Sequence, residues 1–392
     1  MKQPFFSIVL PTKNRPELLR DVISSVLWQN FDDYELIVSD NFNDRQTYEA
    51  VAEFENDRHL KYFRTGSELN MPDHWEWATL KAIGQYTLVL TDRSVLKRGA
   101  LNEIFNLIKT SGSAAVYSWR WSLFDNERNI IFGDSATYQG DPRIIKIIKS
   151  EDLARSFLES QQRFPYVLPR GLNSCYRFDV AENIRGKFGR LFMPAAPDFT
   201  SAFLFLSQVD EIYYINQSLF LSQGLEISTG GQAVLSTATS YLNTLGNVDY
   251  YAHVPIKAPI AENVTFNDFL NIQKLADGNL KDIEMDWVEY FVRCYSELLQ
   301  KMGSRFTDRS TLANLRLEFE NALSLFDAKI QIGVRKKTKG LIFPLLKAKL
   351  KRSFLGPLVI NLKRHLEFML KQGLKGGYSN VLTAAGFNRH NL

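Results

Sequence analysis

The first 120 residues alternate between short apolar runs and segments in which apolar residues recur at helical spacing. The short runs predict buried strands, and the longer segments predict helices packed against them. The expected strands are residues 5–10, 34–40, 60–64, 86–92 and 114–119, and the expected helices are residues 16–27, 47–54, 73–83 and 101–108. Alternating strands and helices build an open, mainly parallel sheet with helices on both faces, so the sequence predicts an α/β fold.

Two residues punctuate the expected helices. Pro16 stands where the first helix should begin, because proline suits the first helical position. Gly84 stands after the third, where a glycine commonly forms the C-cap. Both residues support the element boundaries given above.

Polar side chains directly follow three of the expected strands. Ligands bind beyond the carboxyl ends of strands in such sheets, so these side chains are candidates for ligand contact. They belong to Thr12, Asn14, Arg15, Asp40, Asn41, Asp92 and Arg93. The glycine patterns of dinucleotide-binding folds and P-loop enzymes do not occur, and neither does the spacing of a His- or Cys-based metal site. The candidate chemistry therefore lies in these acids, amides and arginines.

The rest of the chain changes pattern twice. Residues 224–247 are rich in Gly, Ser and Thr, which indicates a loop or linker, and helical spacing dominates beyond residue 262. The sequence therefore predicts a domain over residues 1–235, a linker over 236–262 and a mostly helical C-terminal region over 263–392.

Charge is distributed unevenly. The net charge is +4, yet residues 329–375 carry 13 Lys and Arg against one acid, Glu367, for a local charge of +12. A basic segment interleaved with apolar residues favours binding to an anionic membrane surface, whereas no recognised motif favours nucleic acid. Pro344 and Pro357 are expected to divide it into short helices. The alternative, in which its apolar face packs on the protein and its lysines are solvated, stays open.

Cysteine content and hydropathy bear on location. Cys175 and Cys294 make no disulfide framework in a chain of 392 residues, and no run of about 18 uncharged apolar residues could span a membrane. The apolar N-terminal stretch is too short for a signal peptide and is broken by Pro11. These features predict a cytoplasmic protein, held peripherally on the inner face of the cell membrane if the basic segment binds there.

Several stretches, in this order and at this spacing, resemble a family 2 glycosyltransferase with the GT-A fold, of the kind found in bacterial surface-polysaccharide pathways. They are residues 6–15, 36–44, 71–76 and 84–92, followed by 197–203 and 213–219. The resemblance covers about residues 5–235. It implies a nucleotide-binding half over residues 1–120 and an acceptor half over residues 121–235.

The resemblance implies roles for particular residues. The turn from Pro11 to Arg15 would hold the nucleotide, with Thr12 and Asn14 near the base and ribose and Arg15 near phosphate. Asp40 would accept the N–H of a base, although Asx residues at a strand end also form plain turns. Asp198 would be the catalytic base that deprotonates the acceptor hydroxyl, although an acid before a helix can also serve as its N-cap.

The chain departs from the family at its acidic, metal-binding motif. That motif usually carries two or three Asp, and here it reads Thr91-Asp92-Arg93-Ser94. One carboxylate is a poor site for Mg²⁺ or Mn²⁺. Either a metal binds weakly through Asp92, or Arg93 takes over part of its role against the leaving diphosphate, and a weakened metal requirement is expected. A structural ion pair of Arg93 in an inactive site is the alternative.

Three functional hypotheses follow. The first is an inverting glycosyltransferase that moves a sugar from a nucleotide-diphosphate sugar to a hydroxyl of a glycan or lipid-linked acceptor. The second is a non-catalytic sugar-nucleotide or glycan-binding protein with a degenerate metal motif. The third is a nucleotidyltransferase, which is expected to keep two metal-binding acids where this chain has one.

Overall fold

The computed structural model describes residues 3–42, 45–132, 145–159, 167–223, 239–245, 248–304, 307–352 and 378–387, with a few single residues between 228 and 237. Within these ranges, ten strands form one sheet in the order β3-β2-β1-β4-β9-β6-β10-β5, with β7 beside β6 and β8 beside β10. The strands are β1 (Phe6–Thr12), β2 (Tyr34–Asp40), β3 (Leu60–Arg64), β4 (Tyr86–Val89), β5 (Ser94–Leu96), β6 (Val116–Asp125), β7 (Ile130–Phe132), β8 (Ile145–Lys149), β9 (Ser174–Arg177) and β10 (Glu211–Ser222).

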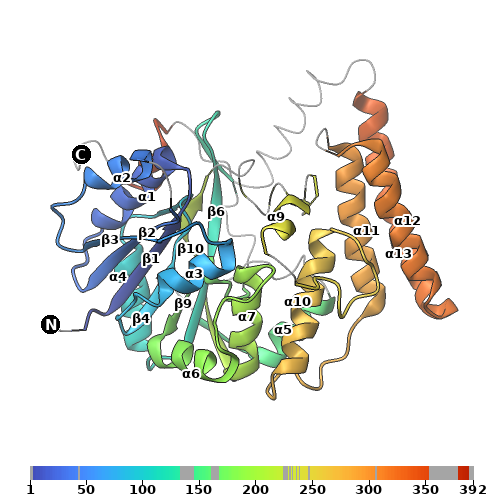
Figure 1. Cartoon of the computed structure of the whole chain (residues 1–392), viewed down its shortest axis with the longest axis horizontal. Coiled ribbons are helices and arrows are strands. Elements are labelled where there is room, and N and C mark those ends of the chain that lie inside the picture. The colour runs from blue at the N-terminus through green and yellow to red at the C-terminus, as the bar shows by residue number, and fades with distance from the viewer. Residues whose placement is uncertain are drawn as a thin grey trace.

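Helices flank this sheet and continue beyond it (Figure 1). The first eight are α1 (Pro16–Leu27), α2 (Arg45–Ala52), α3 (Met71–Thr79), α4 (Ala100–Thr110), α5 (Ser150–Glu159), the 3₁₀ turn η1 (Gly171–Asn173), α6 (Phe178–Phe188) and α7 (Pro197–Gln208). The later helices are α9 (Thr239–Asn243), α10 (Ala261–Leu275), α11 (Trp287–Gly303), α12 (Arg309–Ser324), α13 (Ala328–Arg352) and α15 (Val381–Ala384). The predicted fold class, an open and mainly parallel sheet followed by a helical C-terminal region, is confirmed.

The four N-terminal strands pair as expected, and one later strand alters the series. β3, β2, β1 and β4 are parallel neighbours, which brings their carboxyl ends to one edge of the sheet. The expected strand over residues 114–119 is β6, but it does not lie beside β4. β9 lies between the two and runs antiparallel to both, so a strand that follows β6 in the sequence is inserted between β4 and β6.

Alternating side chains of the strands build a core on each face of the sheet. Ile8 and Leu10 of β1 point to the face covered by α1 and α4, and Val9 points to the face covered by α3, α6 and α7. The second core continues into the C-terminal helices. Phe266 and Phe269 of α10 pack on Phe157 of α5 with ring centroids 5.6 and 5.9 Å apart. The helical region therefore shares its hydrophobic core with the sheet domain.

The segment before α10 is part of this packing. Residues 236–262 were expected as a linker, and Val254, Ile256 and Ile260 are buried there. Tyr290 of α11 donates a hydrogen bond to Asn263, whose amide reaches the carbonyl oxygen of Ile256. The segment before α10 is thus hydrogen-bonded to α10, which is in turn hydrogen-bonded to α11.

The break expected at Pro344 is wrong. Helix α13 runs from Ala328 to Arg352 without interruption. A proline removes one backbone hydrogen bond, and a helix anchored along its first half on α11 can absorb that loss. Val334 and Thr338 provide the anchor, since both are buried. Pro357 and the rest of the basic segment, residues 353–375, lie outside the described residues.

The end of the chain returns to the first half of the molecule. Val381 and Phe387 are buried in the core beneath α1, and Phe387 lies 5.8 Å from Trp28, ring centroid to centroid. The backbone N–H of Arg98 donates to the carbonyl oxygen of Ala385 over 2.8 Å. Residues 378–387 are therefore an integral part of the sheet domain, although the sequence places them after the basic segment.

Gly84 serves a different purpose from the one expected. Helix α3 ends at Thr79 with Leu80 as its C-cap, so Gly84 is not its C-cap. A side chain at Gly84 would place its Cβ 2.6 Å from the backbone nitrogen of Ser7. The glycine permits close approach of this turn to β1.

Candidate active site

Three groups of predicted residues meet at the carboxyl edge of the sheet. Thr12 and Asp40 are the last residues of β1 and β2 and lie opposite each other in the strand register. Asp92 follows β4, in the turn before β5. Asn14 has a φ of +55°, a conformation that asparagine tolerates, and it turns the chain from β1 into α1, which begins at Pro16 as predicted.

Asp92 is the centre of the contacts at this edge. The Arg15 guanidinium donates to Asp92 Oδ1 over 2.9 Å, and the Thr12 hydroxyl donates to Asp92 Oδ2 over 3.3 Å. The Asp92 side chain is 5% exposed, whereas that of Arg15 is 27% exposed. The Arg15 side chain is therefore partly exposed while its guanidinium is paired with Asp92.

Arg93 is held by the residue that follows β10. Its guanidinium donates to the carbonyl oxygen of Gln223 over 2.7 Å, just past the end of β10. Burial lowers the pKa of Arg93, with Asp92 opposing that shift and Arg15 adding to it. Asp92 thus interacts with two arginines, Arg15 and Arg93.

Asp40 is buried, and sequence reasoning missed its partners. The Tyr62 hydroxyl donates to Asp40 Oδ2 over 2.7 Å, and Arg64 Nε lies 4.0 Å from the same oxygen. The Arg64 guanidinium carbon also lies 4.8 Å from the ring centroid of Phe42, which is about half exposed. Tyr62 and Arg64 are on β3, so the strand pairing alone brings them beside Asp40.

Asn41 fastens the loop that leads into α3. Its amide donates to the carbonyl oxygen of Leu69, and its side-chain oxygen accepts from the Leu69 backbone N–H, each over 2.8 Å. The next residue, Asn70, caps α3 by accepting from the backbone N–H of Asp73. Asn41 therefore links the ligand edge to the start of α3.

Asp198 lies in the first turn of α7. The N-cap is Ala196, so the alternative that made Asp198 an N-cap is not what the structure shows. Arg170 Nη1 lies 3.6 Å from Asp198 Oδ2, and the Arg170 guanidinium stacks between Trp121 and Phe199, 4.6 and 5.1 Å from their ring centroids. Burial raises the pKa of Asp198, and Arg170 opposes that shift. A carboxylate with a raised pKa is a better proton acceptor.

Strand pairing relates the Asp198 region to the Asp92 region. Trp121, beneath Arg170, pairs with Phe220 of β10, and Phe220 pairs with Leu96 of β5. Two strand spacings of about 5 Å each separate Trp121 from Leu96. Arg93 immediately precedes β5, so Arg170 and Arg93 flank the same end of β10. The structure brings the two predicted regions to one end of the sheet.

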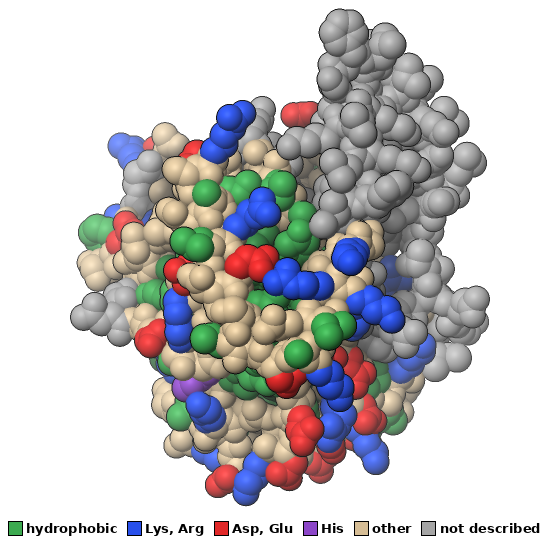
Figure 2. Space-filling model, turned by 90° about the vertical axis from the view of Figure 1, so that its right-hand side faces the viewer, with side chains coloured by type: hydrophobic (Ala, Val, Ile, Leu, Met, Phe, Trp, Pro, Cys, Tyr) green, Lys and Arg blue, Asp and Glu red, His purple; other side chains and the backbone are tan. Residues whose placement is uncertain are grey.

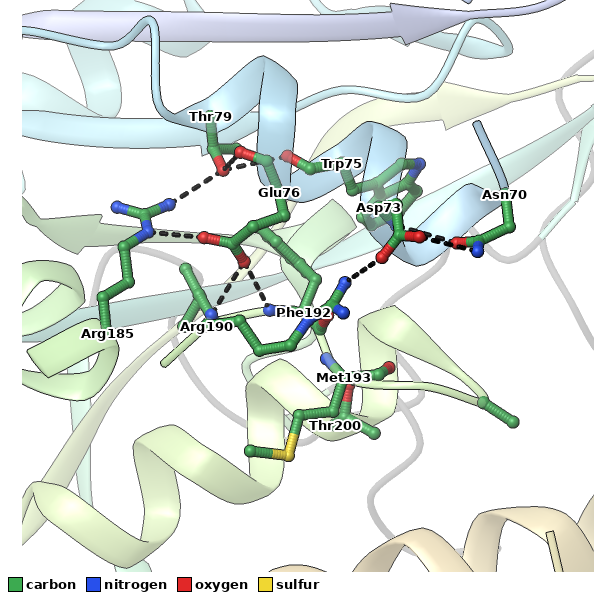
Figure 3. A network of polar contacts seen from close by, with 12 residues as sticks. Asn70, Asp73, Trp75, Glu76, Thr79, Arg185, Arg190, Phe192, Met193 and Thr200 are labelled. Atoms are coloured by element: carbon green, nitrogen blue, oxygen red, sulfur yellow. Dashed lines mark hydrogen bonds and ion pairs between the residues drawn. The ribbon is translucent and has the colours of Figure 1, made fainter. Parts of the chain in front are cut away.

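The loop between α6 and α7 is held by side chains that sequence reasoning missed (Figure 3). Glu76 of α3 accepts from the backbone N–H groups of Leu191 and Phe192 over 2.7 and 2.9 Å, and from Arg185 over 2.6 Å. The Thr200 hydroxyl and the Met193 backbone bond each other in both directions.

The same loop has a second carboxylate at its far end. Asp268 of α10 accepts from the backbone N–H groups of Ala195 and Ala196 over 3.1 and 2.9 Å. Burial raises the pKa of Asp268 to about 7. Glu76 ends one of the stretches that resemble the family, residues 71–76, but the resemblance gave it no role, and the sequence gives no signal for Asp268.

A divalent cation does not fit the side chains at Asp92 as they stand. Both carboxylate oxygens already accept hydrogen bonds, one of them from a guanidinium that a cation would have to displace. Across the described ranges, no group of three or more His, Cys, Asp or Glu is arranged to hold a metal ion. The geometry favours cationic side chains at this position.

Comparison with known proteins identifies the first part of the chain. Residues 7–165 match the model of the family described as Glycosyl transferase family 2. This segment belongs to that family. Over 129 residues the chain is 33% identical to the GalNAc(5)-diNAcBac-PP-undecaprenol beta-1,3-glucosyltransferase of Campylobacter jejuni. That match covers 32% of this chain and 41% of the relative, so it spans less than half of the relative's length.

Two solved structures align with most of the chain, at low sequence identity and with TM-scores under 0.5. S. aureus TarS 1–349 in complex with UDP-GlcNAc has a TM-score of 0.48 at 13% identity, over 86% of this chain and 92% of that chain. The mannosyltransferase PcManGT from Pyrobaculum calidifontis, in complex with GDP-Man and Mn²⁺, has a TM-score of 0.42 at 14% identity, over 90% and 88%.

The surface and the helices add two observations. Figure 2 shows acidic and basic side chains intermixed on the described part of one face, around an apolar area. No helix within the described ranges combines the length and the apolarity that crossing a membrane requires.

Proposed function

We propose that the protein is an inverting glycosyltransferase that moves a sugar from a nucleotide-diphosphate sugar to a hydroxyl of a glycan or lipid-linked acceptor. The observation that carries the proposal is the Thr12–Asp92–Arg15 cluster at the carboxyl edge of a segment that belongs to family 2. The relative from Campylobacter jejuni is named for an undecaprenol-linked acceptor, which supports an acceptor of that class.

In this proposal the residues divide the reaction between them. Asp198 accepts the proton of the acceptor hydroxyl as that oxygen bonds to the anomeric carbon. The bond between the anomeric carbon and the diphosphate oxygen breaks on the opposite face, so the configuration inverts. Arg15 and Arg93 hold positive charge toward the departing diphosphate, which lowers the free energy of the transition state. Asp40 and Asn41, with Pro11, Thr12 and Asn14, shape the nucleotide site.

A panel of nucleoside diphosphates, with and without Mn²⁺, tests donor binding by thermal shift. The diphosphate that stabilises the protein then selects the nucleotide sugars for transfer to a lipid-linked oligosaccharide, and NMR of the product reports the anomeric configuration. A product that retains the donor's configuration, or no transfer from any stabilising donor, would contradict the proposal.

A second candidate is a non-catalytic sugar-nucleotide or glycan-binding protein. The observation that favours it is the engagement of the single motif acid, Asp92, by Arg15 and Thr12. Binding of a nucleoside diphosphate without hydrolysis or transfer in the same panel would select this candidate.

We also propose that the basic segment, residues 329–375, holds a cytoplasmic protein peripherally on anionic membranes. Its described beginning packs on the protein: Val334 is buried against α11, and Lys337 lies 3.1 Å from Glu289. The proposal therefore depends on the charges beyond residue 341. Each basic residue near an anionic surface contributes roughly 1 kcal/mol.

Truncation near residue 328 would be a poor test, because it removes α13 from α11 and residues 378–387 from the core. Replacing basic residues with Gln keeps the chain intact. The variant changes four neighbouring basic residues, Lys347, Lys349, Lys351 and Arg352. The matched control replaces four exposed lysines elsewhere, Lys109, Lys187, Lys274 and Lys281. Co-sedimentation with phosphatidylglycerol vesicles at low salt should fall for the first variant alone, and equal binding by both would refute the proposal.

A further inference from the structure

Asp268 holds the two peptide groups at which α7 begins. Its carboxylate accepts from the N–H of Ala195 and from the N–H of Ala196, which is the N-cap residue of α7. The Tyr241 hydroxyl donates to the carbonyl oxygen of Ala195, so the same residue is held from a second side. These contacts fix the direction in which α7 starts, two residues before Asp198.

Two acceptor oxygens are needed for this arrangement. A carboxylate offers both, whereas an asparagine offers one oxygen and turns an N–H group toward the second backbone donor. Asp268 is 2% exposed, and burying a carboxylate carries a cost in free energy. That cost and the two short contacts indicate that the position requires an acid.

A carboxylate also holds the start of the helix that carries Asp268. Glu297 of α11 accepts from the backbone N–H groups of Ala261 and Glu262 over 2.9 and 2.8 Å. Lys301, fully buried, lies 2.9 Å from Glu297. The contacts therefore run from α11 to the start of α10, and from α10 to the start of α7.

We propose that Asp268 is a positioning residue for Asp198, and that the C-terminal helical region thereby sets the geometry of proton transfer. The inference rests on the proposed function, in which Asp198 is the catalytic base. A displacement of about 1 Å at a reacting group can lower the rate by as much as 10²-fold. Asp268 contacts the backbone at Ala195 and Ala196, and its charge also acts on Asp198. We expect a change at Asp268 to leave the nucleotide edge at Asp92 unchanged.

Asp268→Asn in the full-length protein tests the inference. We expect kcat to fall by about 10- to 100-fold while the dissociation constant of the nucleoside diphosphate stays within about twofold. The matched control is Asn267→Ala. Asn267 is the neighbouring buried residue on α10, and its side chain accepts from the backbone N–H of His253 instead. This control should lower stability without lowering kcat per folded molecule.

A double-mutant cycle separates positioning from a merely structural role. If Asp268 acts through Asp198, then adding Asp268→Asn to Asp198→Asn should change kcat by less than about twofold. Additive losses would overturn the inference, as would a loss in Asp268→Asn while Asp198→Asn stays fully active.

Hydrogen exchange gives a readout that needs no transferase activity. Peptides that span residues 191–200 should exchange faster in Asp268→Asn than in the wild type and in Asn267→Ala. Unchanged exchange there would overturn the inference even if the protein transfers no sugar. If these peptides exchange faster in Asp268→Asn but the wild type transfers no sugar, the result supports the contact and refutes the proposed function.

Discussion

The nucleotide edge and the start of α7 are built in different ways. At the nucleotide edge, Thr12, Arg15 and Asp92 come from the ends of adjacent parallel strands, and the sheet register alone places them together. At α7, the backbone before Asp198 is held by side chains of α3 and α10, and Asp198 itself pairs with Arg170, the residue before η1. The first region should therefore tolerate remote changes, and the second should respond to them.

The largest expected effect belongs to Asp198 itself. Asp198→Asn should lower kcat by about 10²-fold or more, because the acceptor hydroxyl loses its proton acceptor. Nucleotide affinity, measured by calorimetry, should not change. Asp179→Asn is the control, since Asp179 also lies in the first turn of a helix and pairs with an arginine. Full activity of the Asp198 variant would leave this region with a structural role alone.

A local change at the nucleotide edge should affect binding more than turnover. Arg15→Gln should weaken nucleoside diphosphate binding by about 1 to 3 kcal/mol, the usual range for a lost charged hydrogen bond. Lys13→Gln tests whether any nearby positive charge suffices, because Lys13 pairs with the exposed Glu68 instead. Equal losses in the two variants would contradict a specific role for Arg15.

The pH dependence of stability probes the start of α7. Burial raises the pKa of Asp268 to about 7, from 3.8 in the unfolded chain, while Asp198 of α7 adds to the shift and Tyr241 of α9 lies close by. The folded state then keeps a proton that the unfolded state has lost. Asp268 therefore contributes stability that is present below about pH 4 and is lost as the pH rises through 7.

Asp268→Asn removes this contribution. We compare the free energies of unfolding as the wild-type value minus the variant value. This difference should fall by at most about 1.4 kcal/mol per pH unit between pH 4 and 7, and it should not change above pH 7. Denaturant unfolding at several pH values measures it. A difference that rises with pH would show that the carboxyl is ionised throughout.

Metal removal should have the smallest effect. EDTA should change wild-type turnover by less than about twofold, because Arg15 already occupies the carboxylate that a cation needs. In Arg15→Gln, Asp92 loses that partner, so Mn²⁺ should stimulate the variant more than the wild type. Activity that EDTA abolishes and Mn²⁺ restores in the wild type would contradict this assignment.

The same comparison explains which features the sequence could predict. Strand ends are visible as apolar runs followed by polar residues, so Thr12, Asp40 and Asp92 could be placed at one edge before the structure was known. The antiparallel insertion of β9 could not be foreseen, because a four-residue strand has no periodic signal of its own.

The residues that hold the backbone before Asp198 could not be predicted from the sequence either. Glu76 and Asp268 look like ordinary helical acids in sequence, and their function comes from the backbone N–H groups they face. No spacing of residues in the sequence predicts tertiary contacts of this kind. The departure of the Asp92 motif from the family was visible in the sequence. The ion pair between Asp92 and Arg15 is visible only in the structure.

The return of the chain end to α1 has a practical consequence for anyone who handles this protein. α13 stands at the opposite end of the molecule from α1 (Figure 1), yet Val381 and Phe387 are buried beneath α1. A single protease cut between α13 and residue 378 should therefore leave two fragments that co-purify, because each buried apolar side chain contributes about 1.5 to 3 kcal/mol to their association. Cleavage would show on a denaturing gel and stay invisible to gel filtration.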